Sequence, residues 1–157
     1  MNKKTKIIEL RSRNTKKRIC REMSNMFHIN MNSFLSTDNT LKLQKTIMSI
    51  IYEMDLKKSA IKIPKSIQSC HKYIKNNINL LSSKEDKNII FFHHDSVLSG
   101  GIILNIKDVI CRIDYLIENS ELRDQEICFF LVDEYAEYGF CLWRGEYDAT
   151  VYVWGLF

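Results

Sequence analysis

Apolar residues recur at helical spacing in two stretches of the first half of the chain. The first stretch follows Thr37 or Asp38, either of which suits a helix cap, and its apolar positions advance by four, three, one and three residues. They are Leu43, Ile47, Ile50, Ile51 and Met54. The second stretch follows Pro64, which suits a first helical turn, and it carries Ile67, Cys70, Ile74, Ile78 and Leu81. Each pattern predicts an amphipathic helix with one face in the core.

A third helix is predicted from Asn105, with Asp108 favourably placed in its first turn. Its apolar stripe comprises Ile106, Val109, Ile110, Ile113, Leu116 and Ile117. Between the second and third helices lies "NIIFFHHD", residues 88–95, whose short run of β-forming residues predicts a buried strand. The Ser99-Gly100-Gly101 stretch after it predicts a turn.

Three β-prone segments end the chain. They read "EICFFLVDE" (126–134), "YGFCLWR" (138–144) and "ATVYVWG" (149–155), and short polar connections around Ala136 and around 145–148 separate them. This spacing predicts an antiparallel meander. We therefore expect an α+β fold, in which about three amphipathic helices pack on a mainly antiparallel sheet that ends in a C-terminal three-stranded meander.

The alternation along the last two strands places Trp143, Tyr152 and Trp154 together on the face opposite Phe140, Leu142, Val151 and Val153. A sheet with two apolar faces needs cover on both. The cover for the second face is either the helices or a partner.

The composition indicates one globular domain spanning residues 1–157, with 45% hydrophobic and 27% charged residues, one proline and five glycines. The five cysteines are scattered without a C-x-x-C pair, which favours reduced thiols over a disulfide framework or a zinc site. No apolar run follows the N-terminal lysines as in a signal peptide, and the longest apolar run, Ile127 to Val132, is too short to span a membrane. We expect a cytoplasmic protein without a membrane partner.

Charge is strongly polarised along the chain. Residues 1–84 hold 18 Lys and Arg against 5 Asp and Glu, whereas residues 85–157 hold 5 against 14. Residues 1–22 alone contain nine basic and two acidic side chains, and they form either a flexible arm or a first solvated element. A basic cluster of this kind also binds phosphate, so nucleic acid is an alternative partner, through residues 3–21 together with Lys57, Lys58, Lys62 and Lys65.

The sharpest catalytic candidate is His93-His94-Asp95. On a strand, His93 and Asp95 would share a face for acid–base or metal chemistry, and His94 would point the other way. Cys70-His71 is weaker, because neighbouring helical residues diverge and Cys70 lies on the apolar stripe. Without a metal-ligand spacing or a nucleophile motif, we expect a binding protein rather than an enzyme, with no cofactor and no metal site.

The connections of the meander combine acids with tyrosines. Tyrosine offers a large contact area at low entropic cost, and acids speed the approach of a basic partner. Solubilising turns around a sheet would have the same composition. The predicted partner-binding residues are Asp133, Glu134, Tyr135, Glu137, Tyr138, Glu146, Tyr147 and Asp148.

A small, low-glycine chain rich in isoleucine and asparagine, which ends in an aromatic meander with acidic turns, resembles the cytosolic immunity proteins of bacterial polymorphic-toxin systems. Those of contact-dependent growth inhibition systems are the nearest group. The likeness is one of size, composition and general character, and it is strongest over residues 126–157. It implies noncatalytic binding of a cognate toxin domain, often a basic nuclease, whose nucleic-acid site the acids cover. The net charge of +4 departs from the acidic character common in such proteins, so the mechanism depends on the C-terminal half.

The sequence thus favours an immunity or antitoxin-like protein that neutralises a toxin through an acidic, aromatic surface. Two alternatives remain open at this point: a nucleic-acid-binding regulatory protein that uses the basic N-terminal half, and an enzyme centred on His93 and Asp95.

Overall fold

The computed structural model describes residues 2–120 and 127–157. Within these residues the α-helices are α1 (Lys3–Met23), α2 (Thr37–Leu56), α3 (Ile67–Asn77), α4 (Ser96–Ser99), α5 (Ile106–Cys111) and α6 (Ile113–Glu118), and a 3₁₀ helix, η1 (Ile78–Lys84), continues α3. The strands are β1 (Ile61–Ile63), β2 (Asn88–Phe91), β3 (Ile102–Asn105), β4 (Ile127–Val132), β5 (Gly139–Arg144) and β6 (Ala149–Trp154). The α+β prediction is confirmed.

All described strands join one antiparallel sheet in the order β1-β6-β5-β4-β2-β3. The last three strands form the predicted meander, with Val132 opposite Gly139 at one end of β5 and Arg144 opposite Ala149 at the other. Glu126, which begins the first predicted segment of the meander, lies outside the described residues.

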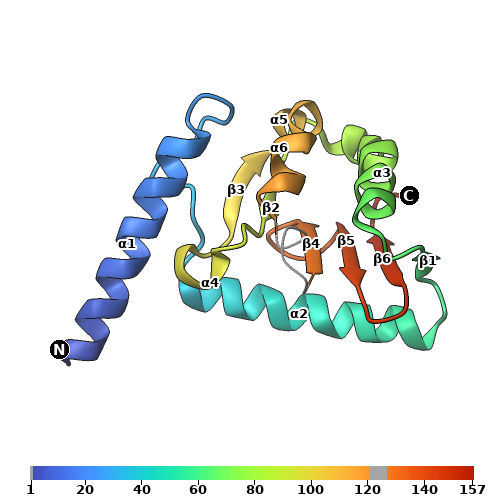
Figure 1. Ribbon diagram of the computed structural model, residues 1–157, viewed down its shortest axis with the longest axis horizontal. Coiled ribbons are helices and arrows are strands. Elements are labelled where there is room, and N and C mark those ends of the chain that lie inside the picture. The colour runs from blue at the N-terminus through green and yellow to red at the C-terminus, as the bar shows by residue number, and fades with distance from the viewer. Residues whose placement is uncertain (1, 121–126) are drawn as a thin grey trace.

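Helix α2 covers one face of the sheet (Figure 1). Its side chains Leu43, Ile47 and Ile51 pack in a buried cluster with residues of β2, β4, β5 and β6. Tyr152 belongs to this cluster and donates a hydrogen bond from its hydroxyl to the Asp55 carboxylate at 3.1 Å. The second face therefore has a helix as its cover.

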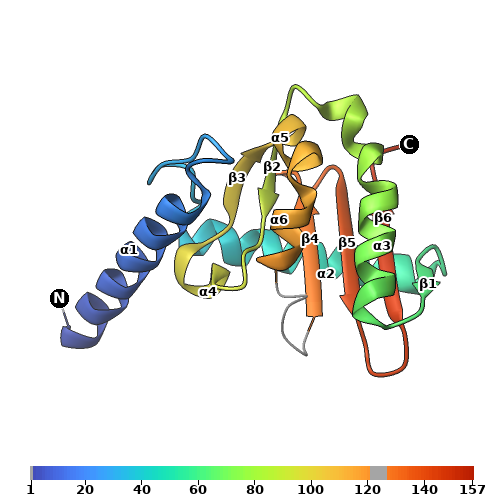
Figure 2. The same ribbon diagram turned by 45° about the horizontal axis from the view of Figure 1, so that its top comes forward.

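The opposite face carries the larger part of the core (Figure 2). Apolar side chains of α3, η1, α5 and α6 pack there on alternate residues of every long strand, including Phe129 and Phe140, whose rings meet edge to face. Cys70 is fully buried in this core, as its place on the apolar stripe predicted. Close packing on both faces makes the sheet the middle of three layers.

Helix α1 contacts the domain through its C-terminal half, where the ammonium of Lys16 lies 5.6 Å from the ring centroid of Phe34. Ile19 and Met23 are its buried side chains, and Arg18 pairs with Asp95 at the start of α4. The rest of α1 extends away from the body of the molecule (Figure 1). The basic N-terminal segment is thus a solvated helix that the core holds at one end.

Three helix boundaries differ from the sequence expectation. Helix α2 is capped by Ser36, whose hydroxyl accepts from the N–H of Asn39, rather than by Thr37 or Asp38. Pro64 lies before α3, because Ser66 takes the cap position. The third helix breaks at Arg112, whose φ of −120° leaves the helical region, so it forms two short helices.

In the described ranges, 2–120 and 127–157, no helix has both the length and the apolar character that crossing a bilayer requires.

Candidate functional site

The turn between β4 and β5, residues 133–138, is organised by its own first side chain. One carboxylate oxygen of Asp133 accepts from the N–H of Tyr135 at 3.1 Å and from the N–H of Glu137 at 3.4 Å. Ala136 adopts a left-handed φ of 56° and donates its N–H to the carbonyl of Asp133. These hydrogen bonds hold the reversal of the chain in one shape. The Asp133 carboxylate is therefore occupied by backbone N–H groups.

The same turn directs Glu134, Tyr135 and Glu137 outward. Tyr135 is 76% exposed, and both glutamates are exposed. Neither glutamate forms an ion pair with any described lysine or arginine. Two negative charges beside an open phenol are therefore available to a basic partner.

Tyr138 does not belong to this surface. Its side chain is 4% exposed in the core, with the Lys84 ammonium 5.4 Å from its ring centroid and its hydroxyl 3.4 Å from the carbonyl oxygen of Asn88. Burial, with nearby carboxylates, raises the pKa of the phenol. The sequence could have predicted this burial. Side chains alternate between the faces of a strand, so Tyr138 lies on the same face as the core residues Phe140 and Leu142.

In the turn between β5 and β6, residues 145–148, lysines from another part of the chain offset the negative charge. The Lys62 ammonium lies 3.2 Å from the Asp148 carboxylate and also donates to Thr150 at 2.8 Å. Lys65 donates to the carbonyl of Glu146 at 2.6 Å. Only Glu146 and Tyr147, which is 85% exposed, present their side chains freely here.

The two acidic turns lie at opposite ends of β5, so they do not make the single acidic surface that the sequence suggests. A strand of six residues spans about 20 Å. Of the eight predicted contact residues, the structure brings together Glu134, Tyr135 and Glu137. Asp133 shapes the same turn, and Asp148 is paired.

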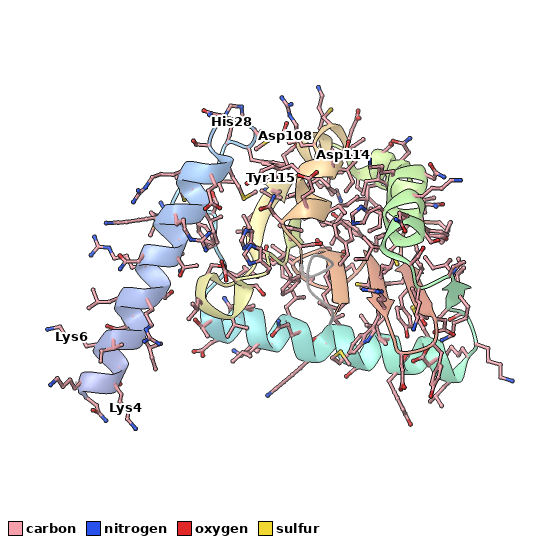
Figure 3. The ribbon with its side chains drawn as sticks, in the orientation of Figure 1. Lys4, Lys6, His28, Asp108, Asp114 and Tyr115 are labelled. Carbon is pink, nitrogen blue, oxygen red and sulfur yellow. The ribbon has the colours of Figure 1, made fainter. Side chains whose placement is uncertain are left out.

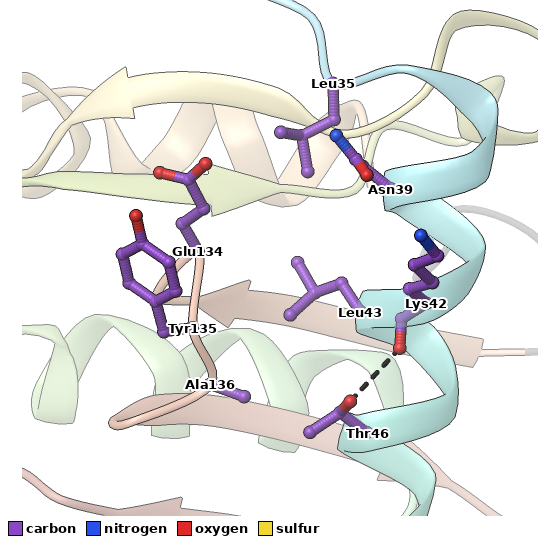
Figure 4. A pocket seen from close by; sticks show the side chains of 8 residues that line it. All are labelled: Leu35, Asn39, Lys42, Leu43, Thr46, Glu134, Tyr135 and Ala136. Atoms are coloured by element: carbon purple, nitrogen blue, oxygen red, sulfur yellow. Dashed lines mark hydrogen bonds between the residues drawn. The ribbon is translucent and has the colours of Figure 1, made fainter.

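A groove runs beside the first turn. Its volume is about 280 Å³, and it lies between the 133–138 turn and the N-terminal half of α2 (Figure 4). Figure 4 shows Glu134 and Tyr135 on one side and the α2 side chains on the other. The lining residues are Leu35, Asn39, Lys42, Leu43, Thr46, Glu134, Tyr135 and Ala136. The groove combines an apolar floor with polar walls, which suits an inserted side chain of a protein partner.

His93, His94 and Asp95 lie beyond the end of β2, so the strand geometry assumed for them is wrong. The two imidazole centroids are 4.1 Å apart, and one potential ligand atom from each of the three residues lies within 4.8 Å of the others. His94 therefore joins the cluster that a regular strand would deny it. Arg18, however, already pairs with the Asp95 carboxylate.

His93 is fully buried, and its Nδ1 accepts from the N–H of Asp95 at 3.1 Å. Its Nε2 is buried without a hydrogen-bond partner among the described residues. Burial, with the neighbouring His94 and Arg18, lowers the pKa of His93 to about 4, so the ring is neutral at pH 7. A base without solvent access cannot reach a substrate, and a guanidinium on the carboxylate disfavours a cation, so this geometry favours a structural role.

Cys70 and His71 face different surroundings on α3. Burial raises the pKa of the Cys70 thiol and lowers the pKa of the half-buried His71. These shifts favour a neutral thiol, which is a poor nucleophile. Cys20, Cys70 and Cys111 are free thiols, as the sequence predicts for these three.

The two basic regions named in the nucleic-acid alternative lie far apart. Helix α1 stands at one end of the molecule, and the segment that carries Lys57 to Lys65 stands at the other (Figure 1). Lys4 and Lys6 project from the free end of α1 (Figure 3). Lys62 and Lys65 are engaged by the second acidic turn, so of these two regions α1 leaves more of its basic side chains without an acidic partner.

A family model described as "YxiF protein" matches residues 19–154. Comparison with the curated proteins and with the solved structures found no match. The match begins at Ile19, where α1 enters the core, so it includes the whole sheet with the helices on both faces and leaves out the protruding part of α1. The chain belongs to the YxiF protein family.

Proposed function

We propose that the protein is a cytoplasmic immunity protein that binds and neutralises a cognate toxin domain, a basic nuclease being the favoured class. The observation that carries the proposal is the exposed turn with Glu134, Tyr135 and Glu137, which has two unpaired carboxylates beside an open phenol and a groove. Such a surface attracts a basic cleft and offers an aromatic anchor once contact is made. The resemblance in size and character to known immunity proteins supports the same function.

The docking centre lies at the first acidic turn rather than across both. A standard interface buries about 800 Å² on each partner, so it extends well beyond one turn. Its centre decides the affinity, because energetically important residues gather there. Glu146 and Tyr147, at the far end of β5, would lie well away from this centre.

Protection of a host cell tests the function directly. The chain is co-expressed with toxin domains encoded beside its own gene, and survival is scored. The double variant Glu134→Lys/Glu137→Lys should lose protection, and its association rate with the purified toxin should fall at least about tenfold at low salt.

The matched control is Glu118→Lys, which reverses an exposed acid on α6. It should protect like the wild type. Unchanged protection and association rate in the double variant would reject the 133–138 turn as the docking site, and failure to protect against any neighbouring toxin would reject the function.

A second candidate is nucleic-acid binding through α1. The observation that favours it is the basic, solvent-exposed helix, whose side chains are exposed or half-buried from Lys3 to Arg18. Phosphate contacts of this kind weaken steeply as salt rises. A chain without residues 2–16 keeps the buried Ile19, so it should fold and lose binding to a labelled duplex in fluorescence anisotropy. Equal binding by both chains would exclude α1.

A further inference from the structure

Helix α2 carries a second apolar stripe that faces solvent. Leu41, Met48, Tyr52 and Leu56 are 52%, 46%, 65% and 66% exposed. At 100° per residue, these four positions lie within about 80° of one another on the helix. Helix α2 therefore carries apolar side chains both toward the sheet and on its outer side, where Lys45 stands among them.

The outer stripe lies roughly opposite the side chains that α2 buries. Leu43, Ile47 and Ile51 point into the core, and the outer stripe is centred about 140° away from them. Single exposed apolar residues are ordinary, but an aligned row on one helix marks an interaction surface. No other element of the described chain covers this row, because its members are at least 46% exposed.

The pattern along the stripe is nearly symmetric about its middle, between Met48 and Ser49. Reversing the direction of the helix exchanges Leu41 with Leu56, and Lys45 with Tyr52. On one flank, Lys42 stands in the N-terminal half and Glu53 in the C-terminal half. An antiparallel second copy would set Lys42 against Glu53 twice, and the ammonium of Lys45 near the ring of Tyr52.

We propose that two copies of the chain associate through this stripe, with their α2 helices antiparallel about a two-fold axis. Isologous contact of this kind needs a surface that complements itself. The stripe with its flanking charges is such a surface. In a parallel pair this flank of one copy would lie on the opposite side of the interface from the same flank of its partner, so Lys42 and Glu53 would not meet. The inference does not rest on the proposed immunity function. None of the four stripe residues lines the groove, and Lys42 is the one flanking residue that does.

The interface is modest in size. A helix of 20 residues is about 30 Å long, and one helix face falls short of the area of a standard interface. The dimer should therefore form reversibly, with a dissociation constant on the order of micromolar. Its mass should rise with concentration from the 18.6 kDa of one chain toward twice that value.

Sedimentation equilibrium over a range of concentrations tests the association. The wild type should show a monomer–dimer equilibrium, and Met48→Lys/Tyr52→Lys should remain monomeric with an unchanged circular dichroism spectrum. Val97→Lys is the matched control, because Val97 is 81% exposed on α4 and lies outside the stripe. A wild type that stays monomeric up to about 1 mM, roughly a thousand times the expected dissociation constant, would overturn the proposal.

Charge exchange tests the antiparallel geometry. Lys42→Glu or Glu53→Lys alone should raise the dissociation constant about fivefold, and the double variant should recover most of the loss. Lys42 and Glu53 are eleven residues apart, about 16 Å along one helix, so recovery cannot arise within one chain. Dimerisation of the double variant no stronger than that of either single variant would overturn the antiparallel pairing.

Discussion

The two acidic turns of the meander have similar compositions and different surroundings. The 133–138 turn holds its shape through Asp133 and leaves Glu134 and Glu137 unpaired. The 145–148 turn is bound by Lys62 and Lys65, which β1 and the residues after it bring alongside. The composition of each turn therefore does not by itself decide how much negative charge it leaves unpaired. At the 145–148 turn, β1 decides this, because its pairing with β6 brings Lys62 and Lys65 alongside.

This difference leaves one turn suited to a basic partner. The ion pair of Lys62 with Asp148 cancels a negative charge at the second turn, and Lys65 adds a positive charge beside Glu146. Both turns still expose a tyrosine, Tyr135 and Tyr147. Each tyrosine offers contact area, and the first adds a negative field to it.

The largest effect that separates the turns should come from their glycines. A Cβ at Gly139 would lie 2.4 Å from the ring of Trp154, whose indole N–H donates to the carbonyl of Ala136 at 3.0 Å. Gly139→Ala must displace that ring and loosen the first turn, so we expect a loss of about 1–3 kcal/mol in the free energy of unfolding. Urea denaturation measures it.

Gly145→Ala is the matched control in the second turn. A Cβ there would lie 3.3 Å from one backbone oxygen, that of Asp148, and Gly145 does not have a positive φ. The free energy of unfolding should change by less than about 1 kcal/mol. Equal losses in the two variants would show that Trp154 does not support the first turn.

The meander itself follows from the sequence. Short runs of β-forming residues and two short polar connections locate β4, β5 and β6. The apolar stripes locate helices α2 and α3. Both signals are local, and the first also located the two turns of the meander.

Long-range pairing could not be predicted in the same way. Strand β1 has three residues, too few for a periodic signal, and it exists because β6 pairs with it. Strand β3 precedes α5 directly, so its apolar residues merge with the helical pattern. The ion pair of Lys62 with Asp148 joins residues 86 positions apart through the register of β1 on β6. The sequence therefore located the acidic turns but could not reveal that one of them is neutralised.

A smaller effect should come from Asp133, which the first turn uses as its internal support. Asp133→Ala leaves the N–H groups of Tyr135 and Glu137 without their acceptor, so we expect a loss of about 1–2 kcal/mol in the free energy of unfolding. Asp133→Asn retains a side-chain oxygen as acceptor and should lose less. Urea denaturation of both variants separates the hydrogen bonds from the charge.

Glu134→Ala is the control for that measurement, because its side chain is exposed and has no ion pair in the described chain. It should lie within about 0.5 kcal/mol of the wild type. If Asp133→Ala also left the free energy of unfolding unchanged, the hydrogen bonds of Asp133 would not be what holds the shape of the first turn.

The smallest effect should come from the ion pair that neutralises the second turn. Its side chains are 62% and 46% exposed, so solvent screens the attraction of Lys62 for Asp148. A double-mutant cycle of Lys62→Met and Asp148→Asn should give a coupling free energy of about 0.2–1 kcal/mol at low salt. The coupling should vanish at about 1 M salt, where the screening length is about 3 Å. If the coupling were zero at low salt as well, Lys62 would not hold Asp148 in solution. Lys65 alone would then oppose the negative charge of the second turn, and the electrostatic preference of a basic partner for the 133–138 turn would be smaller.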